Sequence, residues 1–158
     1  MNGMIDSQLR IYVDANAFIA AVEGWQSGGD ELHEALWRLF DEGEKRGDLL
    51  FTSELSLAEV LVKPLNEGRS TLAATYLDLI RNGPGLTVAP ISRSILILAA
   101  HIRKERKSIK LPDAIHLATA EQEACTVILT NDLRLTSDSA QRISLSSAAI
   151  VNLLPGAS

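Results

Sequence analysis

The sequence is poor in several residue types, and each shortage excludes a class of protein. Cys125 is the only cysteine among 158 residues, so no disulfide can form within the chain and a reducing compartment, the cytoplasm, is expected. Its neighbours, Glu-Ala-Cys-Thr-Val-Ile-Leu, predict a small core residue rather than a reactive thiol. Excess charge is also small. The net charge of −5 predicts no bulk attraction to nucleic acid or membranes, which leaves only a local basic patch for such contacts.

Long apolar runs and low-complexity segments are missing as well. Residues 1–10 contain no apolar stretch long enough for a signal peptide, and no other segment reaches membrane-spanning length, so no membrane partner is expected. We find no repeat or linker, which predicts a single domain over residues 1–158 with its core at about residues 10–153. A hydrophobic share of 46% in a chain of this length is enough for a packed core.

The most informative stretch is residues 110–120, Lys-Leu-Pro-Asp-Ala-Ile-His-Leu-Ala-Thr-Ala. Pro112 is typical of the first position of a helix, and Asp113 then lies in the first turn, at the positive end of the helix dipole. The residues that follow are nearly all small or apolar, which predicts a buried helix. An unpaired buried carboxylate is costly, so Asp113 needs a distant Arg or Lys, or a metal ion. His116 is interpreted as a satisfied core histidine in preference to a ligand or proton carrier.

Short apolar runs alternate with helical patterns along the chain. This alternation predicts a mainly parallel sheet with right-handed crossovers and helices on both faces, an α/β fold with three α/β/α layers. Asn16 is the expected cap of the helix after the first strand, and Ser53 is expected to open the helix after the second. The strands are expected at residues 9–13, 49–52, 86–89 and 126–130, with an edge strand at residues 149–153.

Four acidic residues are expected at one edge of this sheet. Asp14 ends the first strand and Asp132 follows the fourth, while Glu59 and Asp113 lie early in two helices. In such a fold the carboxyl ends of the strands and the amino ends of the helices share the edge where ligands bind. Four carboxylates there repel one another unless a cation compensates. An oxygen-only set favours Mg²⁺ or Mn²⁺ over zinc, and these ions suit phosphodiester hydrolysis.

Glu59 also has two simpler interpretations. Ser56 stands three residues before it, which is typical of a capping box, and Lys63 stands four residues after it, which is typical of a surface ion pair. Asp14, taken alone, equally fits a turn or cap residue. The acids therefore need support from outside their own local patterns.

Four stretches resemble the acidic motifs of PIN domains, and most closely those of the VapC-type toxins of toxin–antitoxin systems. They are Val-Asp-Ala-Asn at 13–16, Ser-x-x-Glu at 56–59, Leu-Pro-Asp-Ala-Ile-His-Leu-Ala at 111–118 and Leu-Thr-Asn-Asp at 129–132. The resemblance covers roughly residues 10–153, and the third motif is its most specific part. It implies a Mg²⁺- or Mn²⁺-dependent endoribonuclease. Members often form homodimers and are inhibited by an antitoxin segment laid across the active site.

The same resemblance implies a role for each residue of the site. Asp14, Asp113 and Asp132 would hold the metal, and Glu59 would bind or polarise water. Asn16 and Thr130 would support these acids. Many relatives have an aromatic residue three positions after the fourth acid, where this chain has Leu135, and we interpret this as a difference in loop packing. The residues expected to act in catalysis are Asp14, Glu59, Asp113 and Asp132.

A basic run precedes the buried helix and allows two interpretations, a solvated helix end or a rim that steers phosphates toward the acids. Its members are Arg103, Lys104, Arg106, Lys107 and Lys110. Two rival functions also stay open. One is a phosphatase with Asp14 as nucleophile, which is disfavoured because Asn16 stands where a second acid is usual and a Gly-rich turn is missing. The other is a PIN-like binding module without activity, which the presence of all four acids disfavours.

Overall fold

The computed structural model describes residues 9–24 and 30–156, and its centre is a five-stranded sheet in the order β3-β2-β1-β4-β5. All four strand pairings are parallel, as the alternation of strands and helices predicts. The strands are short, and the acids that follow them lie within a few residues of the sheet. The strands are β1 (Ile11–Val13), β2 (Leu50–Ser53), β3 (Thr87–Ala89), β4 (Val127–Leu129) and β5 (Gln141–Ile143).

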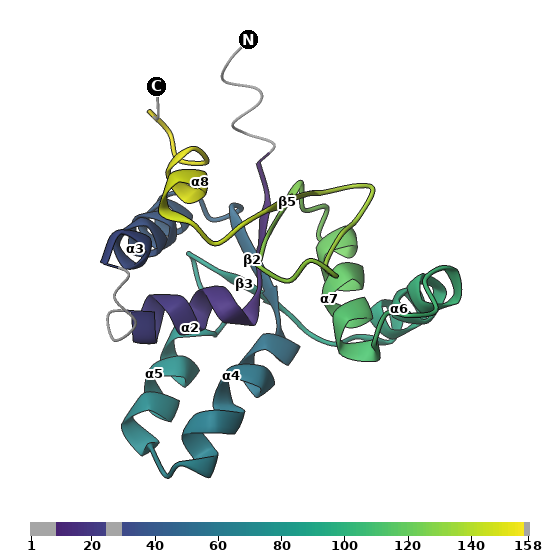
Figure 1. Ribbon diagram of the computed structural model, residues 1–158, viewed down its shortest axis with the longest axis horizontal. Helices are drawn as coiled ribbons and strands as arrows, with labels where there is room; N and C mark the ends of the chain where they lie inside the picture. The colour runs from purple at the N-terminus through teal and green to yellow at the C-terminus, as the bar shows by residue number, and fades with distance from the viewer. Residues whose placement is uncertain (1–8, 25–29, 157–158) are drawn as a thin grey trace.

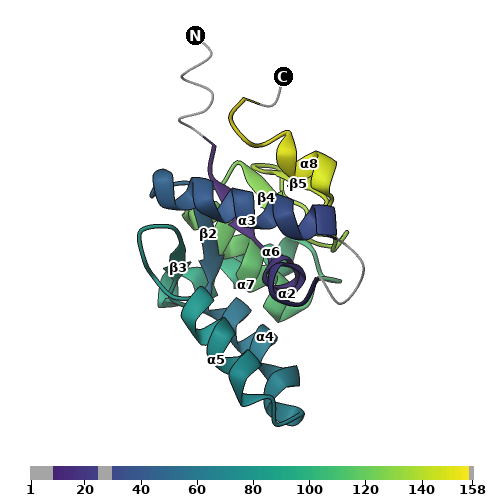
Figure 2. The same cartoon turned by 90° about the vertical axis from the view of Figure 1, so that its left-hand side faces the viewer.

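Helices cover both faces of this sheet, which makes three layers. Figure 1 shows α6 and α7 on one side and α2, α3 and α8 on the other, while α4 and α5 run side by side beneath α2. The view in Figure 2 places α3 and α8 across the sheet and the α4–α5 pair below them. The helices are α2 (Ala15–Glu23), α3 (Asp30–Lys45), α4 (Glu54–Asn66), α5 (Ser70–Leu79), α6 (Arg93–Glu105), α7 (Leu111–Gln122) and α8 (Ser147–Val151).

The first strand shows how the sheet divides the core in two. Ile11 and Val13 point toward the α2 and α3 side, and Tyr12 points toward α6 and α7, because successive side chains in a strand alternate between faces. All three are fully buried. Burial on both faces explains why the strands appear in the sequence as continuous apolar runs.

Several local predictions are confirmed. In α7 Pro112 lies in the first turn, and every residue from Ala114 to Ala120 is buried. Ser53 caps α4, since its hydroxyl oxygen accepts a hydrogen bond from the Leu55 N–H at 3.0 Å. Burial raises the pKa of Cys125 to about 12, so this thiol is a core group and is not poised to react.

Two predictions about local structure are wrong. The cap of α2 is Asp14 instead of Asn16, because the helix begins at Ala15, immediately after the acid that ends β1. Residues 149–153 do not form the edge strand. Residues 147–151 are helix α8, capped by Ser146, and the strands at the two edges of the sheet are β3 and β5. A short, mostly apolar run fits a strand and a short helix equally well, so its periodicity could not decide.

Within residues 9–24 and 30–156, no helix combines the length and the apolar character that crossing a membrane would require.

Candidate active site

Asp14 and Thr130 join the carboxyl ends of the two central strands. Asp14 follows β1 and is only 5% exposed. Its Oδ1 accepts a hydrogen bond from the Ala15 N–H, and its Oδ2 accepts one from the Thr130 hydroxyl, both at 2.8 Å. The Thr130 oxygen in turn accepts the Asp132 N–H at 2.9 Å. One buried hydroxyl therefore ties the first predicted acid to the backbone of the fourth.

The environment of Asp14 makes its negative charge expensive. Burial raises the pKa of its carboxyl above the ordinary value, while the hydrogen bond from Thr130 and the nearby His116 lower it. The carboxylate of Glu59 also raises the pKa of Asp14, because two negative charges close together repel each other. These influences place Asp14, His116 and Glu59 within electrostatic range of one another. A cation at this edge would relieve the cost.

Arg134 lies between the other two predicted metal ligands. Its Nε and Nη2 donate to the two carboxylate oxygens of Asp132 at 3.0 and 2.9 Å, and this pairing lowers the pKa of Asp132. Its Nη1 is 3.8 Å from Asp113 Oδ2, which is an ion-pair contact too long for a hydrogen bond. That Oδ2 atom is buried and has no hydrogen-bond partner. Arg134 is thus one of the two partners predicted for Asp113, which were a distant Arg or Lys or a metal ion, but it leaves Oδ2 without a hydrogen bond.

Glu59 has neither of its simpler roles. The Ser56 hydroxyl hydrogen-bonds Thr52 at 2.8 Å, so it does not form a capping box, and Glu59 Oε1 contacts His116 Nε2. His116 is 2% exposed, and its Nδ1 lies 2.5 Å from the hydroxyl oxygen of Tyr12. The interpretation of His116 as a satisfied core histidine is therefore confirmed. Its contact with a predicted catalytic acid was not expected.

The predicted metal ligands share an edge without yet surrounding one point. Within the described ranges, no three His, Cys, Asp or Glu side chains form a group that could hold a metal ion as they stand. The types of donor still fit Mg²⁺ or Mn²⁺, since they are carboxylate oxygens and Asp113 offers one that is buried and unbonded. Asn16 is exposed in the first turn of α2.

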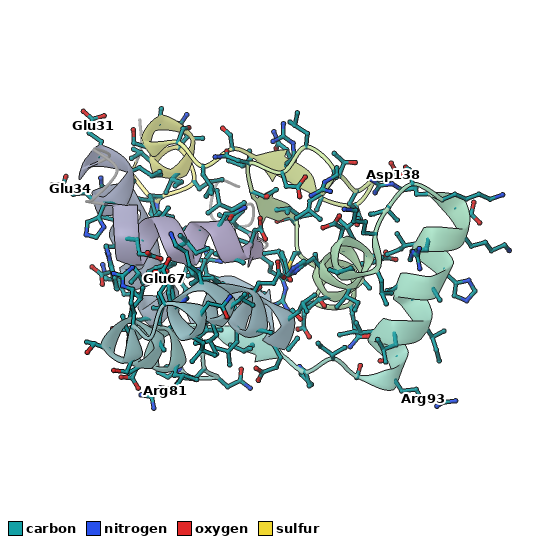
Figure 3. The ribbon with its side chains drawn as sticks, turned by 60° about the horizontal axis from the view of Figure 1, so that its bottom comes forward. Glu31, Glu34, Glu67, Arg81, Arg93 and Asp138 are labelled. Atoms are coloured by element: carbon teal, nitrogen blue, oxygen red, sulfur yellow. The ribbon has the colours of Figure 1, made fainter. Side chains whose placement is uncertain are left out.

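The basic run divides into two kinds of residue. Arg103 donates to the Ile109 carbonyl at 3.2 Å, and Arg106 donates to the carbonyls of Thr136 and Arg134 at 2.7 and 2.9 Å. These arginines fix the end of α6 and the loop after β4. The three lysines of the run, Lys104, Lys107 and Lys110, are exposed, and so is Arg103, while Arg106 is half-buried. Arg93, at the opposite end of α6, points outward (Figure 3).

Two residues of this edge were missed by sequence reasoning. Arg134 stands two positions after Asp132, and an Asp-x-Arg pattern on a loop is a local signal that could have suggested the pair. Tyr12 stands two positions before Asp14 and therefore points to the same face of the sheet, yet its partner His116 is 104 residues away. No local pattern indicates that contact. Leu135 is buried in the core beside α7, which agrees with its interpretation as a loop-packing residue.

Three comparisons place the chain among known proteins. The family model of the PIN domain matches residues 11–137. None of the curated proteins matches the sequence significantly. Among solved structures, VapBC2 from Rickettsia felis bound to a promoter DNA fragment is similar, with a TM-score of 0.65, 13% identity, and coverage of 86% of this chain and 98% of that chain.

Two further structures have a similar fold. A toxin–antitoxin complex from Klebsiella pneumoniae has a TM-score of 0.57 and 20% identity, covering 86% of this chain and 98% of that one. Mycobacterium tuberculosis VapC20, a Sarcin-Ricin loop cleaving toxin, has a TM-score of 0.59 and 17% identity, and the match covers 79% of this chain and 92% of that chain. Because the family match extends from β1 past the loop that carries Arg134 and includes all four acids, this chain belongs to the PIN domain family.

Proposed function

We propose that this PIN-domain protein is an endoribonuclease that uses Mg²⁺ or Mn²⁺ to hydrolyse RNA, and that it is the toxin of a toxin–antitoxin pair. The observation that carries the proposal is the sheet edge that Asp14, Asp113 and Asp132 share. Burial raises the pKa of the Asp14 carboxyl, so its ionised form is costly, and Asp113 keeps a buried oxygen without a hydrogen bond. The similar folds of VapC20 and the VapBC complexes support the assignment.

Asp14, Asp113 and Asp132 would hold the metal. A bound Mg²⁺ or Mn²⁺ would supply Lewis acidity at the scissile phosphate and lower the pKa of water. The guanidinium of Arg134 already spans Asp113 and Asp132, which indicates that the fold needs positive charge at this position. Arg134 would have to release Asp113, and at least one oxygen of Asp132, before either acid could act as a metal ligand.

Glu59 is the acid best placed to handle water. Its side chain is 41% exposed, whereas that of Asp113 is 14% exposed, so Glu59 reaches solvent while it contacts His116. A carboxylate in that position can accept a hydrogen bond from a water molecule and orient its lone pair toward phosphorus. Thr130 would keep Asp14 in place throughout, because its hydroxyl is fully buried.

The RNA path would use the exposed lysines of the basic run. Lys104, Lys107 and Lys110 carry positive charge at the end of α6 and the start of α7, and Lys110 directly precedes the turn that holds Asp113. Contacts to phosphates position a nucleic acid without reading its sequence. Arg103 and Arg106 already donate to backbone carbonyls, so their part in this surface is structural as well as electrostatic.

Two partners follow from the proposal. We infer an antitoxin partner, which the similarity to a toxin–antitoxin complex from Klebsiella pneumoniae supports. From the resemblance to VapC-type toxins we also infer that a segment of this antitoxin covers the acidic edge and that the protein forms a homodimer. Light scattering of the purified protein tests the homodimer directly. Co-purification with the product of a neighbouring gene tests whether an antitoxin binds. If mutation at the acidic edge abolishes this co-purification, the antitoxin binds at that edge.

The decisive experiment is cleavage of RNA by the purified protein with Mg²⁺, with Mn²⁺ and with EDTA, followed by analysis of both ends of the products. We expect internal cuts with a 5′-phosphate and a 3′-hydroxyl, and no cutting in EDTA or by Asp14→Asn. Cleavage that persists in EDTA, or a cyclic phosphate, would contradict the proposal. Free phosphate released from a small ester would favour the phosphatase, and binding without cleavage would favour the inactive module. Sequencing the 5′ ends of cellular RNA after brief induction then identifies the target.

A further inference from the structure

A buried chain of hydrogen bonds runs from the sheet to the exposed acid Glu59. The Thr52 hydroxyl donates to the Val13 carbonyl at 2.8 Å and lies 2.8 Å from the Ser56 hydroxyl. Close to Thr52 and Ser56, the hydroxyl of Tyr12 meets His116 Nδ1 at 2.5 Å, and His116 Nε2 contacts Glu59 Oε1. Tyr12, Thr52 and Ser56 are fully buried, and His116 nearly so. Buried polar groups of this number require an explanation beyond packing, since an apolar core would be simpler to build.

We propose that His116 is a positioning residue that holds Glu59 in the orientation needed for catalysis. The inference rests on the proposed nuclease function and deepens it, because it assigns to this site a residue that does not touch substrate or metal. His116 ties up one oxygen of Glu59 and leaves the other free to face water. The anchor of the arrangement is β1, which carries Tyr12 and is followed directly by Asp14.

The direction of the hydrogen bonds follows from the chemistry of the partners. The carboxylate of Glu59 can only accept, so His116 Nε2 carries a proton and this N–H donates to Glu59. In the neutral imidazole Nδ1 is then an acceptor, and the buried O–H of Tyr12 donates to it. Tyr12 therefore selects the tautomer that can hold Glu59. The edge-to-face packing of the two rings, with centroids 5.8 Å apart, restricts rotation of the imidazole.

Glu59 needs such a partner more than the other acids do. Asp14 is fixed by Thr130 and the Ala15 N–H, and Asp132 is fixed by Arg134. Glu59 has a longer side chain, projects from a helix and is partly exposed, so it would otherwise sample several rotamers. Misplacement of a reacting group by about 1 Å can cost about 100-fold in rate. The contact with His116 removes that freedom before substrate arrives.

Two substitutions test the roles of the two ring nitrogens of His116 separately. His116→Gln places an amide N–H where Nε2 stands, so it keeps the hydrogen-bond donor to Glu59. His116→Asn places its amide near Nδ1, so it keeps the group that contacts Tyr12 and loses the donor to Glu59. We expect His116→Asn to lower kcat about 100-fold with little change in KM. We expect His116→Gln to stay within about tenfold of the parent. His101→Asn, the same substitution on an exposed residue of α6, is the matched control and should change neither constant.

A double-mutant cycle with Glu59→Gln tests whether His116 acts through Glu59. In the Glu59→Gln background, His116→Asn should cause no further loss of kcat, because the residue that it positions is already disabled. Equal losses in both backgrounds would overturn the inference and make His116 a purely structural residue. A His116→Gln variant as poor as His116→Asn would overturn it too.

A spectroscopic measurement keeps this inference separate from the proposed function. In ¹⁵N-labelled metal-free protein, the imidazole nitrogens of His116 should show the Nε2–H tautomer, and Glu59→Gln should shift the Nε2 signal while Tyr12→Phe alters the tautomer ratio. If these signals appear but the parent cuts no RNA, the contact is real and the nuclease proposal fails. If the parent cuts RNA while Glu59→Gln leaves the Nε2 signal unchanged, the nuclease proposal stands and the positioning role fails.

Discussion

Replacing Thr130 by valine tests whether one hydroxyl holds the acidic edge together. The substitution exchanges a hydroxyl for a methyl group in a fully buried side chain of the same shape. It removes the bond to Asp14 Oδ2 and the acceptor of the Asp132 N–H. A hydrogen bond to a charged group contributes about 1.5–3 kcal/mol, and a bond to a neutral amide about 1 kcal/mol or less. The free energy of unfolding should therefore fall by about 2–4 kcal/mol at pH 7.

Urea denaturation followed by circular dichroism, with EDTA present, measures this loss. A domain of this size shifts by about 2–4 °C in Tm for each kcal/mol, so the melting temperature should fall by about 4–16 °C. Thr130→Ser is the control because it keeps both hydrogen bonds and removes only a methyl group, at about 1 kcal/mol. A valine variant as stable as the serine variant would refute the assigned role of the hydroxyl.

The pH dependence makes the test more specific. Because the pKa of Asp14 is raised in the folded protein, its ionisation destabilises the fold as pH rises through the folded pKa, and Thr130 reduces this cost by stabilising the ionised form. The hydroxyl thus makes its full contribution to the free energy of unfolding above the folded pKa of Asp14, and a smaller one as the carboxyl becomes protonated. The difference in free energy of unfolding between the parent and Thr130→Val should therefore narrow as the pH falls from 7 toward 3.8, the ordinary pKa of an aspartate. A difference that is constant over this range would contradict the charge-assisted bond.

Three further predictions concern the charges around this edge. Asp113→Asn should melt no lower than the parent in EDTA, because Oδ2 has no hydrogen bond to lose, but it should lose the stabilisation by Mg²⁺; a much lower melting point would make Asp113 structural. Arg134→Gln should bind Mg²⁺ more tightly by calorimetry, since the guanidinium no longer competes for Asp113 and Asp132; weaker binding would contradict this. Replacing Lys104 and Lys107 by glutamine should raise KM for RNA and flatten its salt dependence, and unchanged kinetics would indicate a solvated helix end.

The parts of the site that could be predicted depend on topology alone. In a parallel sheet, residues that follow strands must meet at the carboxyl edge, so Asp14 and Thr130 come together whatever their rotamers. The burial of α7 likewise follows from its composition, and it brings Asp113 to the same edge. The placement of the acids needed only the order of the elements and the period of their apolar residues, whereas the supporting role of Thr130 was implied by the resemblance to PIN domains.

The partners of the acids could not be predicted, because they depend on side-chain geometry between distant segments. Glu59 and His116 are 57 positions apart, and either side chain could have formed a hydrogen bond with water instead. Arg134 is close to Asp132 in sequence, but its reach toward Asp113 depends on the path of the loop, which Arg106 fixes through backbone carbonyls. Such contacts are determined by packing that no local pattern encodes.

The acids differ in how readily their partners can leave, and this difference orders the events at the site. Thr130 and His116 are buried, so Asp14 and Glu59 keep their partners throughout. The side chain of Arg134 is 59% exposed and can move into water, where a guanidinium is well solvated. Among the described residues, Arg134 is the ion-pair partner that a cation binding Asp113 and Asp132 would have to displace. A divalent cation would replace the single positive charge of the arginine with two, so the carboxylates keep a positive partner, and the folded protein can exist without metal and still accept it without rearranging its core.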